Sequence, residues 1–416
     1  MFSKFVRATF LFLGLFIGLF TGLFTASQVF ASSTQPFHFE MEGTGILHPN
    51  MTMMMSEDDP LQTIIASGER NLKWLQNINA HREDKLSLSS KETQTGHPIE
   101  EGHKYNAEII LAKFNDLKTK LPAEMSKIIL GGGAFTDDPP IEIAEYLKWG
   151  LAVDRLYQTA ARWNNMKPYL GHLKQVRNDD VRGYYFLNKD PQRDVDFANW
   201  INLAAARRAE LSDWLSQICA NTEGNFSRCQ NDVKALATAE QVQNFFKRYF
   251  ENSRTHWNSY FAIEDTRNDI KWDQSQQNQM DTFMTDPKIA EVASFLKVNI
   301  EDEWKTRDWH LTLNIVPSAK THVEFQAGAT PHVNGIAGNT ITMDANAPLT
   351  EYDVQWTIRH EFGHVLGFPD CYLEFYDEDQ AAIVSYQLDI TNLMCSRVGH
   401  FKLSHFDELR KSYFNK

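Results

Sequence analysis

Two histidines four residues apart, His360 and His364, lie near the end of the 416-residue chain. On an α-helix this spacing puts both side chains on one face, so their imidazoles can converge on one metal ion. Glu361 follows the first histidine, where a carboxylate can act as a general base beside the metal. Gly367 supplies the turn that ends the helix, and Asp370 can return to the ion as a third ligand. The pattern predicts a Zn²⁺ site.

The helix that must carry the histidines is predicted over residues 350–366. It begins with a T-x-x-D capping sequence at residues 350–353, and its apolar residues recur at helical spacing. A second helix is predicted over residues 287–304. Alternating or short apolar runs predict nearby strands, which would support the helix. The expected strands cover residues 257–263, 309–316, 322–326 and 339–344.

Met394 and the cysteines lie close to this motif. Met394 follows Asp370 at a distance that allows a turn beneath the metal. Four cysteines permit three pairings, and export of the chain would favour disulfides. Proximity favours two pairs, the first near the middle of the chain and the second joining the third-ligand loop to the methionine turn. These pairs are Cys219–Cys229 and Cys371–Cys395.

The C-terminal motif resembles the metzincin clan of zinc peptidases, whose pattern is HExxHxxGxx followed by histidine or aspartate. The aspartate form with Gly-Phe-Pro-Asp, at residues 367–370, is similar to the snapalysin type. The resemblance implies a Met-turn at Met394 and a substrate-aligning edge strand at residues 340–344. It also implies the following site residues: zinc ligands His360, His364 and Asp370, with Glu361 as general base.

The chain departs from the clan at one position. Some metzincins carry a tyrosine two residues after the methionine, and Ser396 stands there. Tyr372 and Tyr386 are alternative candidates for stabilising an oxyanion, although packing is the plainer interpretation of both. The acidic residues between positions 374 and 379 suit a basic substrate, calcium or a solvated loop. A C-terminal helix is expected to leave its polar residues on the surface: His400, His405 and Glu408.

The fold class expected is α+β. A small mixed sheet plus the metal-binding helix would form a zincin-like catalytic domain, preceded by a mainly α-helical N-terminal region. Within that region, helices are predicted over residues 71–78, 141–163, 197–218 and 238–250. The expected parts are a signal peptide (1–31), an extended polar leader (32–104), a helical pro-domain or accessory domain (105–251) and a zinc metallopeptidase domain (252–416).

The N-terminus has the features of an export signal. Lys4 and Arg7 precede an apolar run, and small residues up to Ala31 suit signal peptidase. An uncleaved anchor is the alternative. After signal cleavage no membrane span is expected, which makes the protein secreted or periplasmic. The formal net charge of −13 argues against nucleic acid or anionic membrane as partners. Composition does not indicate an oligomeric state.

These features favour a secreted zinc endopeptidase that hydrolyses protein or peptide substrates with metal-activated water and Glu361 as base. One alternative is an exported, non-catalytic binding protein stabilised by zinc. Another is a zinc amidase that acts on cell-wall peptides. Glu361 argues against the non-catalytic alternative, because a structural zinc site needs no base and has four protein ligands.

Overall fold

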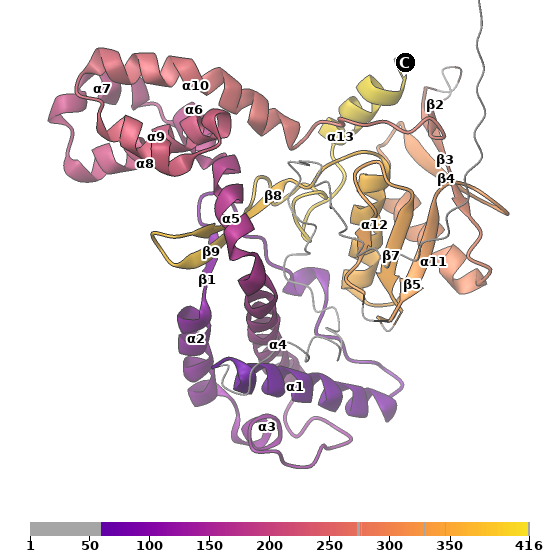
Figure 1. Ribbon diagram of the computed structural model, residues 1–416. Helices are drawn as coiled ribbons and strands as arrows, with labels where there is room; N and C mark the ends of the chain where they lie inside the picture. The colour runs from indigo at the N-terminus through magenta and orange to yellow at the C-terminus, as the bar shows by residue number, and fades with distance from the viewer. Residues whose placement is uncertain (1–59, 273–274, 276, 328, 346, 415–416) are drawn as a thin grey trace, which may run out of the picture. The chain divides into compact units, whose positions relative to one another are not determined.

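The computed structural model describes residues 60–414, except residues 273, 274, 276, 328 and 346 (Figure 1). The expected signal peptide and the first part of the expected leader lie outside the described residues. All described residues belong to one compact unit. None of the helices in this described part is long and apolar enough to cross a membrane.

The helical region, defined here as residues 60–260, contains most of the helices. Their bounds are α1 (Gln62–Ala80), α2 (Ala107–Lys120), α3 (Ala123–Ile129), α4 (Ile143–Met166), α5 (Leu170–Val176), α6 (Arg182–Lys189), α7 (Arg193–Ala198), α8 (Ala205–Glu223), α9 (Phe226–Lys234) and α10 (Ala239–Ser259). A capping box begins α10, since the Thr238 side chain accepts from the Gln241 amide.

Three sequence-based predictions for this region differ from the structure. α1 is longer than the helix predicted over residues 71–78. The helix predicted over residues 197–218 is divided among α7, a short 3-10 turn and α8. The strand predicted over residues 257–263 is wrong, because α10 continues to Ser259 and buries Ser253 on its apolar face. The expected domain boundary at residues 251–252 lies within α10.

The C-terminal region, defined here as residues 261–414, combines helices with short strands, so the α+β class is confirmed. The two longest helices, α11 and α12, pack with the strands around one apolar core (Figure 1). The bounds are β2 (Lys271–Trp272), β3 (Gln279–Thr285), α11 (Ala290–Glu303), β4 (His310–Val316), β5 (His322–Gln326), β6 (His332–Val333), β7 (Thr340–Asp344), α12 (Tyr352–Val365), β8 (Tyr372–Asp377), β9 (Ala382–Gln387) and α13 (Leu403–Leu409).

The strands before α12 form two small mixed sheets. β3 pairs with β4 in parallel and with β2 antiparallel. β7 pairs with β5 in parallel and with β6 antiparallel. A parallel bridge between Met284 and Thr321 joins the two sheets. The expected strands at 309–316, 322–326 and 339–344 are therefore confirmed as β4, β5 and β7.

The expectation that residues 340–344 form an edge strand is wrong. β7 lies between β5 and β6, and Ile341 and Thr342 already pair with Val333 and His332. The segment before β7 looks like a loop in the sequence because it is rich in glycine and polar residues. In the structure it folds back as the two-residue strand β6, which takes the edge position.

A third sheet was not predicted. β8 and β9 form an antiparallel hairpin, and β1 (His103–Tyr105) from the helical region pairs with β9. The acidic residues of β8 obscure its apolar alternation in the sequence. The hairpin therefore connects the C-terminal region to a segment far earlier in the chain.

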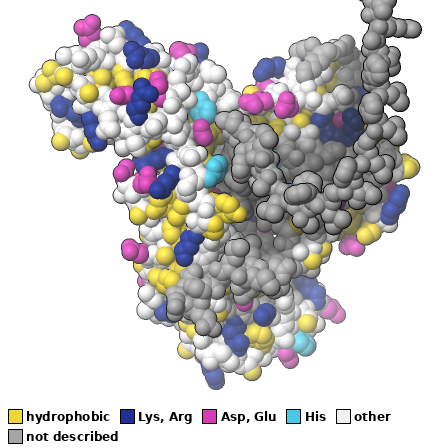
Figure 2. Space-filling view, viewed as in Figure 1, with side chains coloured by type: hydrophobic (Ala, Val, Ile, Leu, Met, Phe, Trp, Pro, Cys, Tyr) yellow, Lys and Arg dark blue, Asp and Glu magenta, His cyan; other side chains and the backbone are white. Residues whose placement is uncertain are grey.

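Charged side chains of both signs are interspersed on the face that Figure 2 shows. On the described part of that face, Lys and Arg side chains do not gather into one large patch.

Candidate metal centre

α12 carries both histidines and is buried along nearly its whole length. Its N-cap residue is Glu351, with no side-chain capping bond, so the predicted T-x-x-D capping box is wrong. The Glu351 carboxylate instead accepts a hydrogen bond from Ser87 of the helical region. Packing and contacts with distant residues, rather than a local cap, fix the start of this helix.

The end of α12 is fixed by Gly367. Its amide donates to the His364 carbonyl at 3.0 Å, and the Phe368 amide donates to the Gly363 carbonyl at 3.0 Å. This is the Schellman arrangement, in which the residue after the C-cap has positive φ. Gly367 has φ 95°, and a Cβ there would lie 2.3 Å from the Asp265 carbonyl oxygen. Both the backbone and the close contact therefore require glycine.

Three donor atoms converge beside α12. His360 Nε2 lies 3.1 Å from His364 Nε2 and 3.1 Å from Asp370 Oδ1. His364 Nε2 lies 3.4 Å from the same Asp370 oxygen. Zinc with ligands at about 2.0–2.1 Å in a tetrahedron imposes ligand-to-ligand distances of about 3.3–3.4 Å. The two imidazoles and the carboxylate thus fit a zinc-sized ion by both chemistry and spacing.

The other nitrogen of each imidazole is anchored. His360 Nδ1 lies 3.0 Å from the Leu393 carbonyl oxygen, and His364 Nδ1 lies 2.8 Å from the Phe368 carbonyl oxygen. A carbonyl can only accept, so both Nδ1 atoms carry hydrogen and donate. In the neutral imidazoles the Nε2 lone pairs then face one another, as metal ligation requires.

The electrostatics of the centre favour a positive charge. Burial alone would lower the pKa of His360, but the hydrogen bond and negative charge of Asp370 outweigh burial and raise the pKa to about 9. Glu361 adds a further negative charge nearby. In the metal-free protein the positive charge comes from the proton bound to the His360 ring. A metal cation at the same position would displace this proton.

Glu361 lies in the same buried group as the two histidines. One of its carboxylate oxygens and a ligand nitrogen of each histidine all lie within 4.8 Å of one another. Its side chain is almost completely buried. The structure therefore places the sequence-predicted base next to the predicted ligands.

Met394 packs directly against the helix between the two histidines. A Cβ on Gly363 would lie 2.2 Å from the Met394 Sδ atom, so only glycine leaves room for this contact. The Met394 carbonyl accepts from the Cys371 amide at 3.0 Å, and the neighbouring Leu393 carbonyl accepts from His360. The turn at Met394 thus contacts His360 and the residue that follows Asp370.

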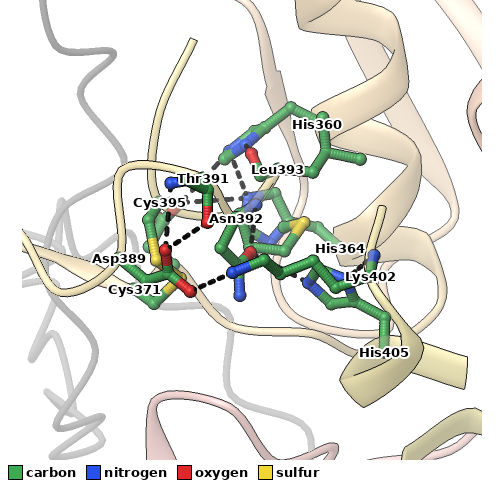
Figure 3. Close-up of a disulfide and its surroundings, with 12 residues drawn as sticks. His360, His364, Cys371, Asp389, Thr391, Asn392, Leu393, Cys395, Lys402 and His405 are labelled. Atoms are coloured by element: carbon green, nitrogen blue, oxygen red, sulfur yellow. Dashed lines mark hydrogen bonds and ion pairs between the residues drawn. A yellow bond between two sulfur atoms is a disulfide. The ribbon is translucent and has the colours of Figure 1, made fainter. Parts of the chain in front are cut away.

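Both favoured disulfides are present, Cys219–Cys229 and Cys371–Cys395. The second joins the residue after Asp370 to the residue after Met394 (Figure 3). It therefore ties the segment at Asp370 covalently to the turn at Met394.

His405 supports the same turn and was missed by sequence analysis. The expectation that it lies on the surface is wrong, because it is buried against Phe368 and Phe401. Its Nδ1 accepts from the Lys402 amide at 2.9 Å, so its Nε2 carries the hydrogen and donates to Asn392 Oδ1 at 2.9 Å (Figure 3). The only sequence signal was its place on an otherwise amphipathic C-terminal helix.

The Asn392 side chain connects His405 to the turn at Met394. Its Oδ1 also accepts from the Met394 amide at 2.8 Å. Burial, assisted by the Lys402 charge and opposed by Asp389, lowers the pKa of His405 to about 4. His405 is therefore neutral at ordinary pH, in the tautomer that holds the turn.

The two tyrosines considered for an oxyanion lie away from that role. The Tyr386 hydroxyl is buried and donates to Asp180 in the helical region at 2.8 Å. Tyr372 is buried as the first residue of β8. Their positions favour the packing interpretation.

The acidic residues after Asp370 fall into two groups: Glu374 and Asp377 are buried in β8, whereas Glu378 and Asp379 are exposed in the turn between β8 and β9. Each is an ion-pair partner of a basic residue in the helical region. The pairs are Glu374 with Arg162, Asp377 and Asp379 with Arg177, and Glu378 with Lys174. Glu374 and Asp377 are therefore held in buried ion pairs, and the exposed part of the expected acidic loop is limited to the turn at Glu378 and Asp379.

No family model, curated protein or solved structure matches this chain. The interpretation of the site therefore depends on the chemistry and geometry of its own residues.

Proposed function

We propose that this protein is a secreted zinc-dependent endopeptidase of the metzincin type. The observation that carries the proposal is the buried group of two Nε2-presenting histidines and one aspartate with Glu361 beside it. A purely structural zinc site has four protein ligands and needs no adjacent base. The disulfides support export, because they persist in oxidising compartments.

In the proposed reaction, His360, His364 and Asp370 hold zinc. The bound ion supplies a Lewis acid that polarises a carbonyl and lowers the pKa of water. Glu361 accepts the proton from the attacking water and delivers it to the leaving amine. Its burial beside the two histidines keeps the carboxylate away from bulk water.

The substrate is proposed to align along β6 rather than β7. β6 and β5 are the two edge strands of their sheet, whereas β7 is paired on both sides. An extended peptide can add to an exposed strand edge through backbone hydrogen bonds. The segment that follows β6 reaches α12, since the Ala337 amide donates to the His364 carbonyl at 2.8 Å. This contact connects the proposed substrate edge to a metal ligand.

The test compares the zinc-loaded full chain with Glu361→Gln on casein and on a peptide library. We expect the wild type to cleave internal peptide bonds, and the variant to keep its zinc while losing activity by about 10²–10⁴-fold. A metal analysis of both proteins controls for zinc loss. If the zinc-loaded wild type cleaves no peptide, the proposal is wrong, and cleavage of cell-wall peptides alone would identify an amidase instead.

A further inference from the structure

The hairpin β8–β9 occupies a sensitive position in the chain. Only Cys371 separates Asp370 from the first residue of β8. The chain leaves β9 at Gln387 and then enters the turn at Met394. Any movement of the hairpin is therefore transmitted to the third-ligand loop and to the turn against α12.

The hairpin is held by backbone pairing with the helical region. β1 pairs antiparallel with β9, and Tyr105 lies opposite Ile383. The last residue of β9 extends this contact, because the Gln387 amide donates to the His97 carbonyl at 2.8 Å. Ile383 belongs to an apolar cluster that otherwise consists of helical-region residues, including Leu61 and Trp163.

The charges of the hairpin also match those of the helical region. All four carboxylates of residues 374–379 face arginine or lysine side chains from α4, α5 and the turn after α5. Arg162 Nε donates to Glu374 at 2.8 Å, and the Tyr105 hydroxyl donates to the same carboxylate. Arg182 lies over the rings of Phe375 and Tyr386.

Arg162 and Glu374 form one of the two buried ion pairs in this set, with side chains 14% and 8% exposed; the other is Arg177 with Asp377. Losing one partner of a buried pair leaves an uncompensated charge away from water. A C-terminal region freed from the helical region would expose the β9 edge and leave Glu374 without its arginine. Such a region is poorly suited to hold Asp370 by itself.

We propose that the helical region is retained in the mature protein as a template for the hairpin, rather than removed as a pro-segment. Arg162 and Glu374 are then positioning residues for the zinc ligand Asp370. The inference depends on the metal site proposed above but not on the peptidase reaction, because its readouts are zinc affinity and backbone protection.

The first test measures zinc affinity of the full chain by competition with a chromophoric chelator, together with hydrogen exchange of residues 372–387. We expect Arg162→Met to weaken zinc binding about tenfold, as for other supporting contacts, and to speed exchange in the hairpin. The matched control is Arg207→Met, since Arg207 pairs with several carboxylates that all lie within the helical region. That control should change neither readout.

A double variant keeps the test valid if Arg162→Met folds poorly. Arg162→Met with Glu374→Gln removes both charges, so zinc affinity and hairpin protection should recover in part. The positioning role is wrong if the folded Arg162→Met protein binds zinc within about twofold of the wild type. It is also wrong if the Arg207→Met control weakens zinc binding equally.

The second test cuts the folded chain at a protease sequence inserted between the exposed residues Glu264 and Asp265. Neither disulfide crosses this cut. We expect the fragments to co-elute and to retain zinc, and the intact secreted protein to include the helical region by mass spectrometry. The proposal fails if the fragments separate and the C-terminal fragment alone keeps full zinc affinity, or if the secreted protein begins near residue 260.

A protein that passes these tests but cleaves no peptide would refute the proposed function and leave this inference standing. A protein that fails them but cleaves peptides would do the reverse. The two proposals are therefore tested separately.

Discussion

His405 gives the metal centre a specific sensitivity to acid. Its ring holds Asn392 only while Nδ1 accepts from the Lys402 amide and Nε2 donates. A second proton on the ring would turn Nδ1 into a donor facing another donor. The change we consider is acidification from pH 7.5 to pH 5, with His405→Gln as the variant that cannot titrate but can still donate to Asn392.

The magnitude follows from the two pKa values of His405. Burial lowers the pKa to about 4 in the folded protein, against an ordinary value of about 6.5 in the unfolded chain. The neutral His405 ring therefore contributes its full stabilisation when the pH is above its pKa in the unfolded chain. This contribution is lost as the pH falls from 6.5 towards 4, because the unfolded chain binds the proton at a higher pH than the folded protein does. At pH 5 the loss is about 2 kcal/mol.

The assay is urea unfolding of the metal-free protein, followed by tryptophan fluorescence, at both pH values. Other titrating groups, including His360, act equally in both proteins and cancel in the comparison. We expect acidification to destabilise the wild type by about 2 kcal/mol more than His405→Gln. If the two proteins lose the same free energy of unfolding within about 0.5 kcal/mol, the neutral, turn-holding role of His405 is wrong.

Three further predictions concern the support of the ligands. In chemical denaturation, Gly367→Ala should lower the free energy of unfolding by about 1–3 kcal/mol more than the control Gly224→Ala. Both glycines have positive φ, but of the two only Gly367 has a backbone oxygen where the new Cβ would lie. Equal losses of unfolding free energy in the two variants would contradict this prediction. Gly363→Ala should displace Met394 and weaken zinc binding about tenfold in a chelator competition, and unchanged affinity would show that the turn does not support the ligands. Replacing Cys371 and Cys395 by alanine should weaken zinc binding. Removing the Cys219–Cys229 disulfide should cost only stability, roughly 3 kcal/mol or less by calorimetry. Equal zinc affinity in the two variants would show that the Cys371–Cys395 disulfide does not support the metal site.

The sequence determines the local part of the centre. The spacing of His360 and His364 fixes their shared helix face, because helical geometry depends only on residue separation. Gly367 ends the helix as expected, because positive φ is a local property of the backbone. The two disulfides also follow from proximity along the chain.

Only the tertiary structure decides the contacts between distant segments. The T-x-x-D sequence before α12 does not cap it: the helix starts one residue later, after Glu351, and the Asp353 carboxylate is engaged by Gln94 and Arg397. β7 becomes an inner strand because a glycine-rich segment folds back beside it as β6. Neither outcome can be computed from local propensity, since each depends on which segments happen to meet.

The same reason explains the largest difference between sequence and structure. By itself, the acidic stretch after Asp370 has the composition of a solvated loop. In the fold it is a strand hairpin, because β1, Arg162 and other basic residues from the helical region supply the backbone partners and the charges that it lacks. The short motif from His360 to Asp370 supplies the residues of the candidate site. The contacts that hold the segment after Asp370 form only when regions far apart in the sequence pack together, so local sequence does not reveal them.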